Sequence, residues 1–199
     1  MTLDMLLSLS GMALAASWTP GPNNSMLASS GATYGLRATM PHVAGIVIGF
    51  PVMIFLVGIG LGEVFRQSPV LLQVLRWVGA LMLLWLAWRT ATAAPAGQSG
   101  RTTRPLTFTE ASAFQWVNPK SWLAAIAITS QFVTPAAPLA TALAVALVFV
   151  GAGISATLAW AAFGQAIGKR LNTPLRLRIF NLAMASMLVA FLLALMLGR

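Results

Sequence analysis

Two short segments interrupt apolar stretches of this chain with residues that hydrocarbon tolerates poorly. The first is TPGPNN, residues 19–24, and the second is VNPK, residues 117–120. Proline removes a backbone donor and clashes with the preceding helical turn, so each segment should break a helix and leave backbone polar groups unpaired. The half-helix after a break presents its N-terminus, which attracts anions. These residue types favour binding of a carboxylate-bearing solute.

The second break carries the stronger chemical signal. Asn118 followed by Pro119 is typical of a helix N-cap and first helical position. Lys120 lies ten residues beyond Glu110, which at ~1.5 Å per residue is roughly 15 Å, half of a hydrocarbon core ~30 Å thick. An ammonium at that depth costs at least ~2.5–3.5 kcal/mol, so an intramembrane lysine is a candidate functional residue. The structural alternative is a simple cap, with the lysine reaching an interface.

The first break offers a counterpart. We expect Asn23 and Asn24 to cap a helix that begins at Ser25. The solute's carboxylate would then lie between these half-helix ends and the end at Asn118, with Lys120 adding positive charge. The alternative is a proline kink that serves only helix packing. The candidate solute-binding residues of the two breaks are Pro20, Gly21, Pro22, Asn23, Asn24, Asn118, Pro119 and Lys120.

Composition places these breaks in a membrane. The chain of 199 residues is 58% hydrophobic and 8% charged, whereas soluble domains are about 25% charged. Its apolar runs of about 15 to 30 residues suit helices, because barrel strands would be alternating segments of about 10 residues. The predicted fold class is therefore all-α and integral to the membrane.

Six apolar segments are predicted to span the bilayer as one polytopic domain, 1–199. A linker at 91–110, rich in Pro, Gly and Ser, separates a first three-helix unit, 1–90, from a second, 111–199. The first and fourth segments contain the breaks. The predicted spans are 3–33, 40–61, 69–90, 111–133, 137–168 and 175–197.

The two breaks occupy corresponding places, each in the first helix of its unit. Because three is odd, the second unit enters the membrane in the opposite direction, which gives two inverted three-helix repeats. Corresponding broken helices in inverted halves point to a transporter binding site near the midplane. Either break alone fits a packing kink, whereas the pair favours function.

Charge predicts the orientation. The net charge of +9 comes from 12 Lys and Arg against 3 Asp and Glu. The basic residues lie mostly in loops between spans, which encodes topology and argues against a nucleic-acid partner. The loops after the first, third and fifth spans hold Arg37, Arg89, Arg101, Arg104, Lys169, Arg170, Arg176 and Arg178. The opposite side holds Arg66, Arg76 and Arg199. The first set is thus predicted to be cytoplasmic, with both termini outside; a re-entrant first break would reverse the N-terminus.

The N-terminal segment MTLDMLLSLSGMALAAS imitates a signal peptide. It carries Asp4 where a positive n-region is expected, and the apolar pattern resumes after Asn24. We interpret it as a retained first helix.

The broken segments and the third span resemble the LysE/RhtB family of bacterial amino-acid exporters. TPGPNNSMLASSGATYGLRATMPHVAGIVIGF resembles the family's opening signature. LRWVGALMLLWLAWRTATA is similar to its third-span motif, and FQWVNPKSWLAAIAITSQFV to its fourth. The doubled asparagine and LLWLAW are most similar to the cysteine/O-acetylserine exporter branch.

This resemblance implies efflux of amino acids or close derivatives across the bacterial inner membrane, driven by the proton gradient. It implies the same binding positions: Pro20 to Asn23 in the first signature, and Asn118 to Lys120 in the second. No cofactor or metal is expected.

A proton-coupled carrier needs a group that titrates. The carboxylates Asp4, Glu63 and Glu110 all lie near span ends. His42 begins the second span, where a packed or interfacial histidine is the commoner role. Burial favours the neutral form of an amine, so Lys120 is the sequence-based candidate.

Three other functions would place different demands on the sequence. An intramembrane enzyme would need a nucleophile with a base, or metal ligands, at depth, and a chain with no Cys and one His predicts no enzyme. A passive channel shares inverted repeats, and a scaffold or assembly factor would tolerate alanine at Asn23 and Asn118. GxxxG spacing at Gly45/Gly49 and Gly164/Gly168 permits close helix approach and hence a homodimer.

Overall fold

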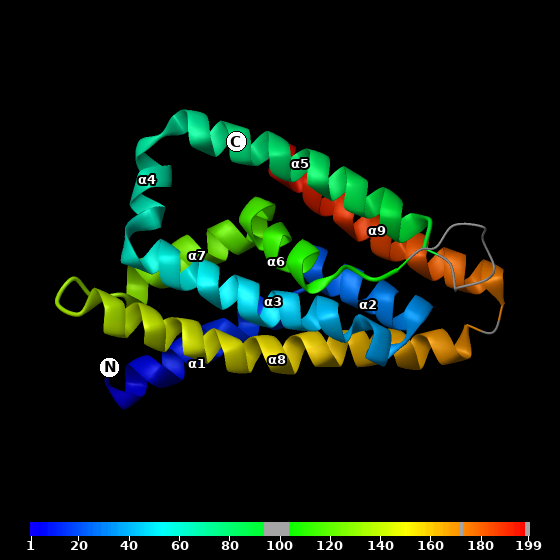
Figure 1. Ribbon diagram of the computed structural model, residues 1–199, viewed down its shortest axis with the longest axis horizontal. Helices are drawn as coiled ribbons and strands as arrows, with labels where there is room; N and C mark the ends of the chain where they lie inside the picture. The colour runs from blue at the N-terminus through cyan, green and yellow to red at the C-terminus, as the bar shows by residue number, and fades with distance from the viewer. Residues whose placement is uncertain (94–103, 172, 198–199) are drawn as a thin grey trace.

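Helices make up every regular element of the described residues. The computed structural model describes residues 1–93, 104–171 and 173–197 (Figure 1). In chain order the elements are α1 Leu3–Trp18, α2 Pro22–Tyr34, α3 Leu36–Leu56, the π-helical turn η1 Val57–Leu61, α4 Gly62–Gln67, α5 Pro69–Ala91, α6 Phe108–Val117, α7 Pro119–Phe132, α8 Pro138–Arg170 and α9 Pro174–Leu197. The all-α prediction is confirmed.

Four of the described helical segments are long and apolar enough to cross a membrane. They are Leu36–Val64, Pro69–Ala91, Pro138–Arg170 and Pro174–Ala194, and they correspond to the second, third, fifth and sixth predicted spans. The first and fourth predicted spans are each divided into two shorter helices, α1 with α2 and α6 with α7. Both breaks are therefore present where the prolines predicted them.

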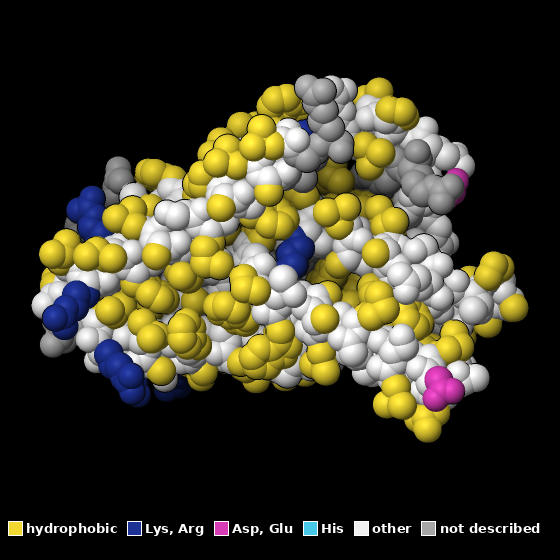
Figure 2. All heavy atoms as spheres, turned by 180° about the vertical axis from the view of Figure 1, so that it is seen from behind, with side chains coloured by type: hydrophobic (Ala, Val, Ile, Leu, Met, Phe, Trp, Pro, Cys, Tyr) yellow, Lys and Arg dark blue, Asp and Glu magenta, His cyan; other side chains and the backbone are white. Residues whose placement is uncertain are grey.

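The outer surface matches a hydrocarbon environment. Large apolar side chains on the long helices are exposed, including Trp77 and Leu81 on α5 and Leu139 and Leu147 on α8. Figure 2 shows hydrophobic side chains across the face, with most of the visible Lys and Arg gathered at one end and acidic side chains at the other. Apolar surface of this extent marks a membrane-facing protein. The chain is a multi-pass membrane protein.

The basic end is built from the ends of several helices. The C-termini of α2, α5 and α8 and the N-termini of α3 and α9 lie there (Figure 1). Among the residues behind the orientation prediction, Arg101 and Arg199 and the side chain of Arg66 lie outside the described part of the chain. The same holds for residues 94–103 of the predicted linker.

One segment differs from its predicted form. The chain after residue 61 was expected to leave the helix, but α4 continues it as a short helix. The change of direction occurs at Gly60, whose φ of 131° lies in the region that only glycine adopts readily.

Helix α2 is the central element of the bundle, and it packs against α3, α5, α8 and α9. The backbones of α2 and α8 approach each other closely at two glycines. A Cβ added at Gly31 would overlap the carbonyl of Ala161, and one at Gly164 would overlap the carbonyl of Ala28. Small residues permit such approach between membrane helices.

The other glycine pair is also used inside the chain. A Cβ at Gly45 would lie 2.5 Å from the Phe108 carbonyl oxygen, and one at Gly49 would lie 2.8 Å from Cα of Ser112. Both GxxxG pairs therefore face neighbouring helices of the same chain. The homodimer stays a prediction, and these glycines no longer support it.

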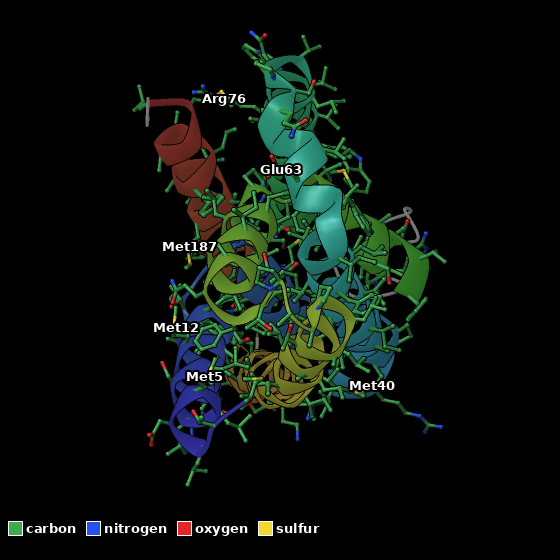
Figure 3. The ribbon with its side chains drawn as sticks, turned by 90° about the vertical axis from the view of Figure 1, so that its left-hand side faces the viewer. Met5, Met12, Met40, Glu63, Arg76 and Met187 are labelled. Atoms are coloured by element: carbon green, nitrogen blue, oxygen red, sulfur yellow. The ribbon has the colours of Figure 1, made fainter. Side chains whose placement is uncertain are left out.

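Helices α5 and α9 form a neighbouring pair. Figure 3, seen along the bundle, shows Arg76 reaching from α5 toward the end of α9, where its Nη2 donates to the Met196 carbonyl at 2.7 Å.

The apolar interior falls into two clusters. One gathers around Leu27, Leu83 and Leu188, and the other around Leu9 and Phe149. Helix α3 contributes to both, because Ile46 belongs to the first cluster whereas Phe50 packs against the second. The polar residues of the two breaks lie next to this division.

Candidate solute-binding site

The first break is a three-residue gap. α1 ends at Trp18, and α2 begins at Pro22 after the extended Gly21. The prediction that Asn23 and Asn24 cap a helix from Ser25 is therefore wrong. Proline's preset φ and missing N–H suit the first helical position, so the helix starts three residues earlier. Both asparagines lie in its first turn.

Asn24 binds the carbonyls that the first break leaves free at the end of α1. Its Nδ2 donates to the carbonyl oxygens of Ser17 at 2.9 Å and Thr19 at 3.0 Å. These carbonyls belong to the last turn of α1 and the residue after it, which have lost their helical partners. Asn24 is buried. Its amide binds backbone of its own break rather than capping α2.

The second break is sharper. Asn118 alone separates α6 from α7, and its Oδ1 accepts from the Lys120 backbone N–H at 3.1 Å. Pro119 occupies the first position of α7. The predicted N-cap and first-turn proline are confirmed.

Lys120 joins the two breaks. Its Nζ donates to the Thr19 carbonyl at 2.6 Å and lies 3.4 Å from the Pro20 carbonyl. A Cβ at Gly21 would come within 2.9 Å of this Nζ, so the glycine leaves room for the ammonium. A cation at the C-terminal end of α1 also complements that helix's dipole.

A buried amide, which sequence reasoning missed, completes the junction. Gln115 of α6 is fully buried. Its Oε1 accepts from Asn23 Nδ2 at 2.9 Å and from Ser121 Oγ at 3.0 Å, and its Nε2 donates to the Ala111 carbonyl at 2.9 Å. The available signal was a single glutamine in an apolar run, because a buried amide in a membrane must be paired.

The junction encloses a cavity of about 60 Å³, which holds a few water molecules at ~10–15 Å³ each. Five predicted residues line it: Gly21, Asn23, Asn24, Asn118 and Lys120. The three prolines are absent from its lining and act by shaping the backbone. Lining residues that the sequence did not single out are Ala16, Ser17, Ile46, Phe50, Ser121, Ala124, Gly153 and Thr157.

The cavity presents charge and dipoles of defined sign. The ammonium of Lys120 is half-buried at its wall, and α2 begins without a side-chain cap. The first-turn N–H groups of α2 and the ammonium both favour an anion. Within the described residues, no group of three or more His, Cys, Asp or Glu side chains could hold a metal ion. The arrangement is suited to holding a carboxylate.

Comparison with known proteins identifies the family of this chain. The family model described as LysE type translocator matches residues 14–199, which include both breaks. The chain belongs to the LysE-type translocator family. It is a membrane transporter and not an enzyme.

Related transporters match along most of their length. The chain is 32% identical to a cysteine/O-acetylserine efflux protein of Escherichia coli O1:K1 / APEC, over 89% of this chain and 94% of that protein. Proteins with the same description are 31% identical in E. coli O157:H7, over 92% and 97%, and in E. coli strain K12, over 89% and 94%. No solved structure matches the chain significantly. The resemblance found in the motifs is therefore confirmed at the level of the family.

Proposed function

We propose that this LysE-type translocator exports amino acids or close derivatives across the bacterial inner membrane as a proton-coupled carrier. The cysteine/O-acetylserine efflux proteins among its relatives make these two solutes the first to test. Both are small and polar, which suits a cavity enclosed by two half-helix starts.

A single observation carries the proposal: the two broken helices meet at one cavity that polar residues of both line, and Lys120 of one break binds the carbonyls of the other. In hydrocarbon, broken backbone is tolerated only where protein or a water-filled cavity satisfies it. The solute carboxylate would bind Lys120 and the uncapped first turn of α2. Its ammonium would take the place of Lys120 on a carbonyl such as that of Thr19.

The proposed architecture has six membrane spans. Residues 1–90 and 111–199 form inverted three-helix repeats, in which α1–α2 and α6–α7 are the broken first and fourth spans. Alternating access then moves one three-helix set against the other around the cavity. The basic end faces the cytoplasm, since positive loops stay inside, and both termini lie outside.

The test uses purified protein in liposomes preloaded with labelled cysteine, O-acetylserine and a panel of other amino acids, with and without an imposed pH gradient. We expect efflux of a few small solutes that accelerates with the gradient. Asn118→Ala should reduce it, because the second break loses its cap. Lys169→Gln, in the exposed last turn of α8, should leave it unchanged.

Other outcomes of this experiment would favour other functions. Efflux that ignores the gradient and exceeds carrier turnover would favour a passive channel. No efflux of any solute, together with unaltered cellular function of Asn23→Ala and Asn118→Ala, would favour a scaffold or assembly factor.

A further inference from the structure

A second polar cavity lies toward the basic end of the bundle, apart from the junction of the breaks. It has a volume of about 30 Å³ and is lined by hydroxyls of α2, by the end of α5 and by residues 104–106 of the loop before α6. At ~10–15 Å³ each, about two water molecules fit. Among its polar lining residues are Ser29, Ser30, Tyr34, His42 and Arg89.

His42 is the exceptional member of this lining. Its side chain is 1% exposed, and within the described chain neither Nδ1 nor Nε2 has a hydrogen-bond partner. A buried polar group left unpaired costs ~1–3 kcal/mol. Ionisable residues inside membrane spans are retained chiefly for function. The imidazole therefore needs water in this cavity, and it can exchange a proton with that water.

The charged groups around His42 are already paired with other partners. From α5, Arg89 donates to the carbonyls of Arg104 and Pro105, at 2.8 and 3.3 Å, and lies 3.7 Å from Glu110. From α6, Glu110 accepts two hydrogen bonds from the Arg104 guanidinium. From α2, Tyr34 is the titratable neighbour, and none of the charged residues of α8 lines the cavity. Among the described residues that line this cavity there is no carboxylate to hold an imidazolium permanently, so a proton taken up here can be released again.

Lys120, the candidate from sequence, has the opposite surroundings. Its Nζ donates to carbonyl oxygens. Carbonyl oxygens bind an ammonium well, but they have no hydrogen to donate to the lone pair of a neutral amine. These contacts favour a lysine that keeps its proton and holds the two breaks together.

We propose that His42 is the proton-binding residue of this transporter, exchanging protons with the basic-end compartment through the second cavity. The inference rests on the proposed transport function. The step is protonation of one ring nitrogen by cavity water, and its reversal; no bond to the solute forms or breaks. Helix α2 connects the two events, because Asn24 lines the solute cavity and Ser29 and Ser30 line the proton cavity, about 8–9 Å further along at ~1.5 Å per residue.

The test separates proton-driven transport from solute exchange in liposomes. We expect His42→Gln to lose efflux driven by the pH gradient while retaining solute exchange at equal pH, which needs no net proton movement. Trp160→Phe is the matched control, because Trp160 Nε1 is the other unpaired buried polar atom among the described side chains. It should retain both activities.

Intact gradient-driven efflux in His42→Gln would overturn the inference. Loss of solute exchange in a variant that still folds would also overturn it, because that result would indicate a structural role for His42. If His42→Gln does not fold, His42→Phe takes its place. Proton movement measured with the wild-type protein is an independent test: solute movement that carries no protons also overturns the inference. Wild type that exchanges solute but ignores pH refutes the proton site and the proposed proton coupling, and leaves amino-acid transport standing. Wild type that moves no amino acid refutes the proposed function itself.

Discussion

The two breaks that meet at the proposed solute cavity are built differently. At the first, three residues separate α1 from α2, and the new helix starts at Pro22, after Gly21, without a side-chain cap. At the second, Asn118 alone separates α6 from α7 and caps the new helix itself. The carbonyls left at the end of α1 are bound by Asn24 and by Lys120, which comes from the other break.

This difference assigns different roles to the breaks. The second satisfies its own backbone and has a cation to donate, so we expect it to act as the rigid partner. The first depends on outside groups and retains uncapped N–H groups in its first turn, so it is the part that a solute can compete for. A zwitterionic amino acid supplies both an anion for those N–H groups and a cation for those carbonyls.

Removing the cation should produce the largest effect. Lys120→Gln loses both the carbonyl contact across the breaks and the charge offered to a carboxylate. A hydrogen bond to a charged group is worth ~1.5–3 kcal/mol, about ten- to a hundredfold in affinity. We expect gradient-driven efflux and solute exchange to fall together, measured as initial rates in liposomes.

The chain provides a matched control for this variant. Its other lysine, Lys169, lies exposed in the last turn of α8, and Lys169→Gln should transport normally. Exchange that survives in Lys120→Gln while gradient-driven efflux is lost would instead make Lys120 the proton carrier, as the sequence alone suggested.

Much of this comparison was predictable from local sequence, because proline acts locally. The positions of both breaks, the cap at Asn118 and the first-turn place of Pro119 follow from the residue types. The start of α2 does not, since Asn23, Asn24 and Gly21 are all good N-cap residues and only the tertiary contacts decide between them.

The contacts between residues far apart in the chain could not be predicted from the sequence. That Lys120 binds the carbonyl of Thr19, 101 residues away, depends on how α7 packs beside α1. Gln115 gave a weak signal as one polar residue in an apolar run. His42 gave an ambiguous one: its place near a span end suggested a packed or interfacial histidine, and its side chain is buried beside residues of α2 and α5.

The amide pair between the breaks should show an intermediate effect. Asn23 and Gln115 exchange two hydrogen bonds, at 2.9 and 3.3 Å. Gln115→Ala removes this partner from the half-buried amide of Asn23, and an unpaired buried polar group costs up to ~1–3 kcal/mol. Asn23→Ala should cost less, because Gln115 keeps its bonds to Ser121 and to the Ala111 carbonyl. The double variant should therefore lose less stability than the sum of the singles, with a coupling of ~0.5–3 kcal/mol in detergent-solubilised protein.

A second cycle shows whether this coupling is specific. Asn24 binds only carbonyls of its own break among the contacts described for its side chain. Asn24→Ala should then be additive with Gln115→Ala. Equal coupling in both cycles would mean that the breaks respond as one unit, and the distinction between them would fail.

The smallest effect concerns the start of α6, the helix that leads into the second break. Thr107 and Glu110 form a capping box there, and Arg104 donates to both oxygens of Glu110, at 2.6 and 2.9 Å. This guanidinium is the main reason that the pKa of Glu110, which lies ahead of the predicted fourth span, falls from 4.5 to about 2. Because the folded pKa is the lower one, the carboxylate stabilises the protein above about pH 4.5, and that contribution is lost as the pH falls toward 2.

Glu110→Gln should therefore lower the melting temperature by a few degrees at pH 7, and the difference from wild type should shrink as the pH is lowered below 4.5. Asp4 is the matched control, since it occupies the first turn of α1, the helix that leads into the first break, and is exposed. Asp4→Asn should change the melting temperature less at pH 7. If the two variants behave alike, the fixed start of α6 is not what makes the second break the rigid partner, and its rigidity must come from the Asn118 cap and the Gln115 amide alone.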